Sequence, residues 1–169
     1  QEQIVKAVVL NSKLSAPLYN SLGYNVDVLK INVMMEISRG IAQGLSYQEM
    51  ARNLKNVTNV DYNKTLRIAK TEGHRIQQEA TYNVQKRAIA KGADIVKQWD
   101  STLDGKTRPT HRALDGQIVG VDEYFKNESG YKALYPGDFG VPSEDCNCRC
   151  CLLQRAKWAL SDEEFTKMN

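Results

Sequence analysis

The stretch Cys146-Asn147-Cys148-Arg149-Cys150-Cys151 contains all four cysteines of a chain of 169 residues. Cysteines two apart in an extended strand have Cα atoms about 6.5–7 Å apart, at or beyond the usual disulfide limit. The chain has no distant cysteine with which this stretch could form a disulfide between separate segments. We therefore expect reduced thiols or metal ligands, and hence an intracellular folding environment.

The composition is that of a globular protein, with 41% hydrophobic and 25% charged residues. No apolar run is long enough to predict a transmembrane helix, so no membrane partner is expected. The sequence starts without methionine and without a signal-peptide pattern, which predicts a fragment or a processed piece of a longer protein. The net charge of +3 is too small to predict nucleic-acid binding by itself.

The sequence predicts a helical region over residues 1–92. Residues 1–10 are expected to form a helix, and residues 11–23 have the composition of a connection. Apolar residues at spacings of three and four over residues 26–41 predict an amphipathic helix, which Gly44 is placed to end.

Two further helices are expected in this region. Ser46-Tyr47-Gln48-Glu49 has the form of a capping box, which predicts a short helix through Leu54 that residues 56–59 break. The longest helix is predicted over residues 61–91, with Gly92 after its last turn. Its apolar stripe comprises Tyr62, Leu66, Ala69, Gly73, Ile76, Ala80, Val84 and Ala88. The glycine in this stripe predicts a kink or a close helix contact.

After Gly92 the pattern changes, and residues 93–169 predict a small lobe that contains both strands and helices. Short strands are expected over residues 95–99, 117–121 and 149–153, and an irregular loop is expected over residues 123–142. The local signals are a turn at Asp104-Gly105, a short helix from Pro109 to Gly116, and a last helix capped by Ser161. The expected fold class is therefore α+β.

The cysteine stretch predicts half of a metal site. If it is extended, Cys146, Cys148 and Cys150 share one face. Two thiolates are suitable ligands for tetrahedral zinc, His111 is the expected third ligand, and Asp104 or Cys146 is expected to be the fourth. The alternative interpretation is a buried strand in which free cysteines serve as small hydrophobic residues.

His111 also suggests a general base, because Arg108, Asp104 and Asp100 lie close to it in the sequence. The protein class would then be a toxin-like nuclease or transferase. No nucleophile or oxyanion-hole signature accompanies this histidine. We therefore favour a structural interpretation, in which Asp104 and Arg108 form a hydrogen-bonded pair that holds the turn.

The longest predicted helix carries seven basic residues against three acidic ones. Such a surface can neutralise the phosphates of double-stranded DNA without sequence preference, although most charged helix faces are only solvated. A DNA-binding module is therefore a further alternative function. The basic residues are Lys64, Arg67, Lys70, Arg75, Lys86, Arg87 and Lys91.

Three motifs follow one another in the second half of the chain. The first consists of Trp99 and, five residues later, the pattern Asp-x-x-Thr-Arg-x-x-His-x-x-Leu-Asp-Gly. This pattern starts at Asp104 and ends in Asp115 and Gly116. The second is Tyr135-Pro136-Gly137-Asp138, and the third is Asn147-Cys148-Arg149-Cys150. Together, over residues 95–153, they resemble the phage Mu F-like minor head protein family, which weakly includes residues 67–72 as well.

The resemblance implies a non-enzymatic minor head protein of a tailed phage or prophage. Such proteins associate with the portal protein and other head proteins, and they accompany the packaged DNA and influence its delivery. The implied location is the interior of the capsid, after assembly in the host cytoplasm. The family motif contains Trp99 and Arg108, which we expect to be structural, as are Asp115 and Gly116. It includes only two of the four cysteines, so the resemblance assigns no role to Cys146 and Cys151.

Overall fold

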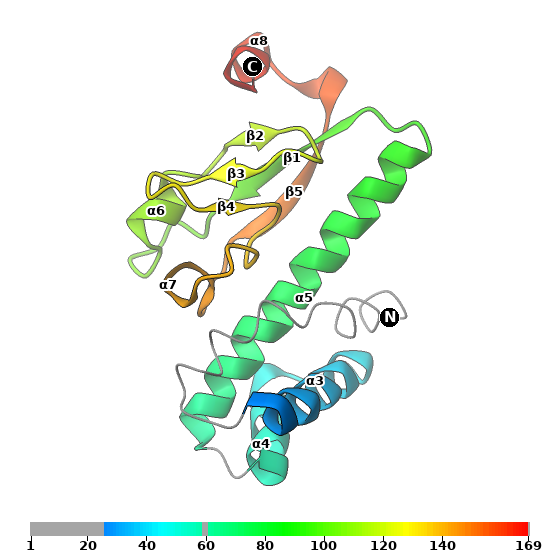
Figure 1. Cartoon of the computed structure of the whole chain (residues 1–169). Coiled ribbons are helices and arrows are strands. Elements are labelled where there is room, and N and C mark those ends of the chain that lie inside the picture. Colours follow the sequence, from blue (N-terminus) through cyan, green and yellow to red (C-terminus); the bar gives the residue numbers. More distant parts are fainter. Residues whose placement is uncertain (1–25, 59–60, 169) are drawn as a thin grey trace. The chain divides into compact units, whose positions relative to one another are not determined.

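A computed structural model of the protein describes residues 26–58 and 61–168 (Figure 1). The helix expected over residues 1–10 and the connection over residues 11–23 lie outside the described residues. The described chain divides into two compact units. We call them the helical unit, which ends at Gln77 and includes Gly140–Cys148, and the sheet unit, Gln78–Phe139 with Arg149 onward. Among the described helices, none has both the length and the apolar character needed to cross a membrane.

The helical unit is built from α3 (Val26–Ala42), α4 (Tyr47–Thr58) and the first part of α5 (Tyr62–Ala90). Figure 1 shows α3 and α4, in blue and cyan, lying side by side. Their inner faces and that of α5 form an apolar cluster that gives this unit its core. Its buried members are Val33, Ile37, Met50, Ala51, Leu54, Ile68, Ala69 and Ile76.

The capping signals of these helices are confirmed. Gly44 has a φ of +70°, and the amide of Leu45 donates to the carbonyl of Gly40 at 2.9 Å, which closes α3. Ser46 and Glu49 exchange backbone-to-side-chain hydrogen bonds of 2.8 and 3.3 Å at the start of α4. The predicted end of α4 at Leu54 is wrong, because the helix continues to Thr58. Its last residues are partly or fully exposed, and polar residues there cost a helix only a few tenths of a kcal/mol each.

Helix α5 follows its predicted apolar stripe only as far as Ile76. A Cβ atom at Gly73 would lie 2.7 Å from a ring carbon of Tyr47, so the predicted close contact with a neighbouring helix is confirmed. Beyond Ile76 the stripe prediction is wrong, because Val84 is 47% exposed whereas Gln85 is 1% exposed. The apolar period cannot identify a helix face that buries polar side chains.

The sheet unit contains an antiparallel sheet in the order β2-β1-β5 (Figure 1). In this sheet Asp100 lies opposite Cys151. A separate hairpin joins β3 and β4. The strands are β1 (Ile95–Asp100), β2 (Ile118–Val119), β3 (Phe125–Lys126), β4 (Lys132–Ala133) and β5 (Cys151–Ala156). The short helices are α6 (Pro109–Arg112) and α8 (Asp162–Met168) in this unit, and α7 (Pro142–Asp145) in the helical unit.

The α+β class is confirmed, but two local predictions are wrong. Residues 146–150 do not form one extended strand, since α7 ends at Asp145 and a turn at Cys146 and Asn147 follows, in which Asn147 has a φ of +53°. Residues 123–142 are not irregular throughout, because they contain the hairpin of β3 and β4. The change from helix to strand follows Gly92, whose φ is +90°. A domain boundary at that residue stays a prediction, since the two compact units divide within α5.

Lys97 occupies the interior of the sheet unit with no exposed surface. Its ammonium group donates to the carbonyl of Leu134 at 2.8 Å. It also lies 5.1 Å from the ring centre of Tyr82 and 5.0 Å from that of Phe125. Burial lowers the pKa of Lys97 to about 8, because a low-dielectric interior disfavours the charged form. The two ring faces and the carbonyl stabilise the cation only in part.

Replacing Lys97 by methionine should remove a pH dependence of stability. Folding lowers the pKa from 10.5 to about 8, so the unfolded chain binds more protons in this window and the wild-type free energy of unfolding rises with pH there. The difference in this free energy between wild type and Lys97→Met should therefore change by about 2–3 kcal/mol between about pH 7.5 and about pH 10.5. Urea denaturation measures it, with Lys126→Met as the exposed-lysine control. A difference that is constant with pH would contradict the expectation.

Candidate metal centre

The pairing of β1 with β5 brings together the residues that follow one strand and precede the other. Because Asp100 lies opposite Cys151 at the end of the paired strands, the residues just beyond this pair, Ser101 and Cys150, are also neighbours. The Ser101 hydroxyl oxygen is 3.5 Å from the Cys150 sulfur. One step further, the Thr102 hydroxyl donates to the carbonyl of Arg149 at 3.1 Å. The chain that precedes Cys151 is thus fixed alongside the loop that follows β1.

Helix α6 places His111 against Ser101 and Cys150. Pro109 is its first residue, as expected from its fixed φ. The turn after α6 ends at Gly116, whose φ is +77° and whose amide donates to the carbonyl of Trp99 at 2.9 Å. Asp115 accepts from the amide of Ser101 at 2.7 Å. The segment from β1 to Gly116 is therefore a closed loop, and His111 within it is 2% exposed.

His111, Cys148 and Cys150 form a buried group that could hold a metal ion. The Nδ1 atom of His111 is 3.3 Å from the sulfur of Cys150. The ligand atoms of all three side chains lie within 4.8 Å of one another. No disulfide involves any of the four cysteines, all of which are described. The expectation of reduced thiols thus agrees with this structure, and the sequence identified the three residues that come together.

Aromatic rings and a hydroxyl surround the histidine in the sheet unit. The ring of Trp99 meets that of His111 edge-on at 5.7 Å between centres, and Phe139 lies 5.6 Å away. Ser101 donates to the carbonyl of His111 at 2.7 Å while its oxygen contacts Cys150. Such surrounding contacts orient metal ligands and exclude water. Sequence reasoning did not identify Ser101 or Phe139, because only the strand register and the folded loop place them here.

Asp104 and Cys146 are not members of this buried group. Arg149 binds the Asp104 carboxylate with both guanidinium nitrogens, at 2.5 and 2.6 Å. This hydrogen bonding by Arg149, with that from the amide of Lys106, holds the pKa of Asp104 well below its usual range. Cys146 instead packs against the apolar cluster of the helical unit. This geometry therefore gives no support to either residue as the fourth ligand.

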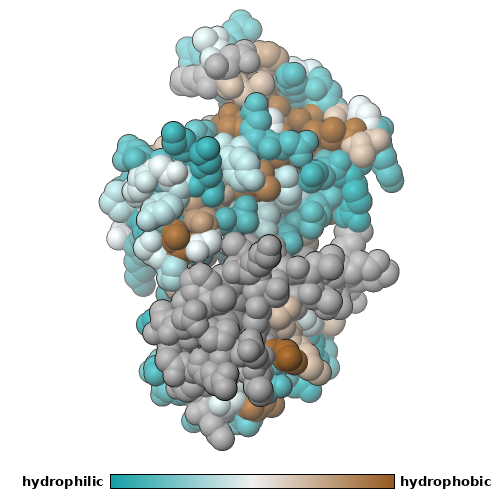
Figure 2. All heavy atoms as spheres, in the orientation of Figure 1, coloured by the Kyte–Doolittle hydropathy of each residue, from teal (hydrophilic) through white to brown (hydrophobic). Residues whose placement is uncertain are grey.

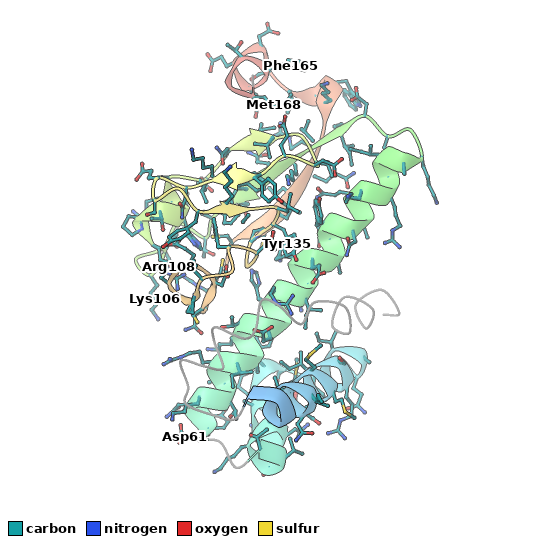
Figure 3. The ribbon with its side chains drawn as sticks, viewed as in Figure 1. Asp61, Lys106, Arg108, Tyr135, Phe165 and Met168 are labelled. Atoms are coloured by element: carbon teal, nitrogen blue, oxygen red, sulfur yellow. The ribbon has the colours of Figure 1, made fainter. Side chains whose placement is uncertain are left out.

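The turn between β1 and α6 also differs from the prediction in its ion pair. We expected Arg108 to pair with Asp104, whereas the bidentate partner of this carboxylate is Arg149. Figure 3 labels Arg108 with Lys106 in this turn. Arginine suits this position because its planar guanidinium matches the two carboxylate oxygens. The sequence did not indicate Arg149, since 45 residues separate it from Asp104.

Cys151 differs from its neighbour in exposure. Because β5 starts at Cys151, side chains alternate from there, so Leu152 is buried and Cys151 is exposed. Partial burial raises the pKa of the Cys151 thiol. This residue is therefore a suitable control for substitutions in the buried group.

The seven basic residues predicted to bind DNA do not have the same surroundings. Arg75 is 4% exposed and forms an ion pair with Glu72 at 3.0 Å, so its inclusion in a solvent-facing basic surface was wrong. Lys86 pairs with Asp122 at 3.2 Å. The exposed basic side chains are Lys64, Arg67 and Lys70 in the helical unit, and Arg87 and Lys91 in the sheet unit.

Comparison with known proteins gives a match to one family and to two relatives, of which one is named as an enzyme and the other as a head protein. Residues 31–153 match the family described as Phage Mu protein F like protein. The chain is 42% identical over 151 residues to the NAD(+)--arginine ADP-ribosyltransferase EFV of Enterococcus faecalis, which covers 89% of this chain and 30% of that protein. It is 36% identical over 122 residues to the minor head protein GP7 of Bacillus phage SPP1, which covers 72% of this chain and 39% of that protein.

The chain thus spans well under half the length of either relative. No solved structure matches it. The family match includes all three residues of the buried group and the whole segment from β1 to Gly116.

Substitutions should separate the metal-binding residues from their neighbour. Cys148→Ser and His111→Ala should each remove bound metal and the effect of chelator on thermal unfolding, whereas Cys151→Ser should leave both unchanged. For the wild type, a chelator should lower the melting temperature by several degrees, since each kcal/mol corresponds to about 2–4 °C in a chain of this size. Elemental analysis of protein purified without a histidine tag measures the loading. Loading below about a tenth of an equivalent, with a chelator-insensitive melt, would leave the cysteines as core residues.

Proposed function

Because the chain belongs to the Phage Mu protein F like family, we propose that it is a structural minor head protein of a tailed phage or prophage. The observation that carries this proposal is the family match over residues 31–153, together with the similarity to a minor head protein. In this role it associates with the portal protein and other head proteins and takes part in delivery of the packaged DNA. It lies in the capsid interior of the virion after assembly in the host cytoplasm.

A second candidate function comes from the relative that is named as an ADP-ribosyltransferase. The two relatives match 89% and 72% of this chain, so most of the matched residues are common to both. A segment shared by a head protein and a transferase need not carry transferase activity, and 70% of the transferase lies outside its match. We therefore assign the shared segment a non-enzymatic role.

The geometry around His111 supports the same assignment. A general base needs a side chain that a substrate proton can reach. His111 is 2% exposed and its Nδ1 atom faces Cys150, while Arg149 binds the carboxylate of Asp104. A nuclease or transferase centre built on these residues would require both contacts to be broken.

Zinc is the metal we propose for the buried group. Two thiolates and one imidazole are ligands that zinc prefers, whereas calcium and magnesium prefer oxygen. Tetrahedral zinc places a bound nitrogen and a bound sulfur about 3.6 Å apart. The observed separation between His111 and Cys150 is 3.3 Å, so little movement is needed to seat the ion. Its role would be structural, linking α6 to the chain just before β5. Elemental analysis of the wild-type protein identifies the metal.

For double-stranded DNA we propose a reduced surface of Lys64, Arg67 and Lys70. These side chains are exposed within seven residues of α5, where they can neutralise phosphates without reading bases. Such binding is weak and depends on salt. It suits a protein that accompanies packaged DNA.

The head-protein proposal predicts that the protein is found in purified particles. Mass spectrometry of gradient-purified virions or procapsids should detect it together with the portal protein. A matched sample from an amber mutant of its gene is the control. Absence from particles, combined with transferase or nuclease turnover that His111→Ala abolishes, would favour the enzyme instead.

The DNA proposal predicts a loss of affinity when the three basic side chains are reversed. Lys64→Glu/Arg67→Glu/Lys70→Glu should weaken binding to duplex DNA and reduce the slope of log affinity against log salt by about 2–3, since each phosphate contact contributes about 0.9. The control is Lys126→Glu/Lys132→Glu, which changes exposed lysines on the hairpin of the sheet unit. Titrations at two salt concentrations measure both quantities. Equal affinities for the two variants would mean that this helix face is only solvated.

A further inference from the structure

Trp158 exposes 85% of its surface, more than any other exposed large hydrophobic residue in the described chain. The other tryptophan, Trp99, has no exposed surface. Trp158 lies beyond residue 153, where the family match ends. An exposed indole ring keeps a large apolar area in water, and tryptophan is enriched at protein interfaces.

The segment that carries Trp158 is fixed on both sides. On its N-terminal side, β5 ends in the pair of Ala156 with Ile95, and the amide of Lys157 donates to the carbonyl of Asp94 at 3.1 Å. Trp158 itself lies in the short 3-10 helix η1 (Lys157–Ala159). The indole is therefore presented by ordered backbone, which reduces the entropy lost on binding.

Helix α8 fixes the C-terminal side of this segment. Ser161 and Glu164 form a capping box, with bonds of 2.9 and 3.3 Å. Glu164 also pairs with Arg155 of β5 at 3.3 Å. Both ends of the segment are thus attached to the same strand.

Apolar surface continues on α8 next to this segment. Phe165 is 39% exposed, and the Lys157 ammonium lies 5.6 Å from the centre of its ring. Figure 3 labels Phe165 and Met168 on this helix, and Figure 2 shows apolar atoms reaching the surface near α8. Two aromatic side chains are therefore available within eight residues.

The first turn of α8, between Trp158 and Phe165 in the sequence, carries acidic side chains. Asp162 and Glu163 are exposed. Within the described chain, neither carboxylate takes part in an ion pair or a hydrogen bond. Two exposed carboxylates without an ion-pair partner in the same segment as the indole disfavour contact with DNA or anionic lipid at their position, because both carry negative charge. They favour a partner that carries positive charge.

We propose that Trp158, Phe165, Asp162 and Glu163 form a docking surface for a protein that presents an apolar pocket flanked by arginine or lysine. Tryptophan is enriched among the residues that dominate binding energy at interfaces. Such residues lie in well-packed pockets of the partner. Arginine can stack on the indole face while its guanidinium pairs with a carboxylate. The proposal concerns a different surface from the metal centre and the basic residues of α5.

Site-specific photo-crosslinking in the native cells tests this surface on the full-length protein. A benzophenone amino acid replaces Trp158, and a matched control carries it at Tyr124, which is 54% exposed elsewhere on the sheet unit. Mass spectrometry of the linked peptides identifies what is contacted. We expect position 158 to link to one protein through a peptide rich in lysine or arginine, at least about five-fold more than position 124.

Charge variants provide the second measurement. Asp162→Asn/Glu163→Gln should lower the yield of the position 158 crosslink at least about five-fold, whereas Glu128→Gln should not change it. The proposal is overturned if position 158 links no protein above the control, links an acidic peptide or another part of its own chain, or gives the same yield in both charge variants. A basic partner that is not a head protein would contradict the proposed function and leave this inference intact.

Discussion

The antiparallel pairing of β1 with β5 is the constraint on which the sheet unit depends. Six residue pairs, from Ile95 with Ala156 to Asp100 with Cys151, align two segments that lie more than fifty residues apart. The register places Ser101 beside Cys150, so a shift of one residue would move every side chain to the other face. Such a shift would separate His111 from Cys150. It would also move Trp99 out of the core. One set of backbone hydrogen bonds thus stabilises the sheet and assembles the candidate metal centre.

Local chemistry made several helix ends predictable, although not the end of α4, because each signal acts within a few residues. Gly44, Gly92 and the capping residue Ser46 each ended or began a helix where the sequence indicated. The second half of α5 was not predictable in this way. There the buried face carries Gln78 and Gln85, and the amide of Leu152 donates to the Gln78 side chain at 2.8 Å. The periodicity of apolar residues cannot identify this helix face, because the face packs against a strand edge whose backbone groups need hydrogen-bond partners.

The candidate site was predicted in part and for an incorrect geometric reason. Ligand chemistry singled out His111, Cys148 and Cys150, which lie together. This prediction depended on alternation of side chains along a strand, whereas Cys146 and Asn147 form a turn with Asn147 at positive φ. The role of Asp104 depends on its distant partner Arg149, and no local pattern could indicate that pair. Long-range pairs become visible only once the strand register is known, so zinc and its fourth ligand stay predictions.

The central position of β1 has a consequence for synthesis on the ribosome. Helices α3 and α4 follow each other closely, so their contacts can form as soon as both have left the exit tunnel. Strand β1 emerges early, but its longest partner β5 is made only after fifty further residues. At about 5–20 residues per second, β1 and its apolar Trp99 wait several seconds with an unpaired edge. A ribosome that stalls between the two strands would hold a nascent chain that exposes this edge to chaperones and to other chains.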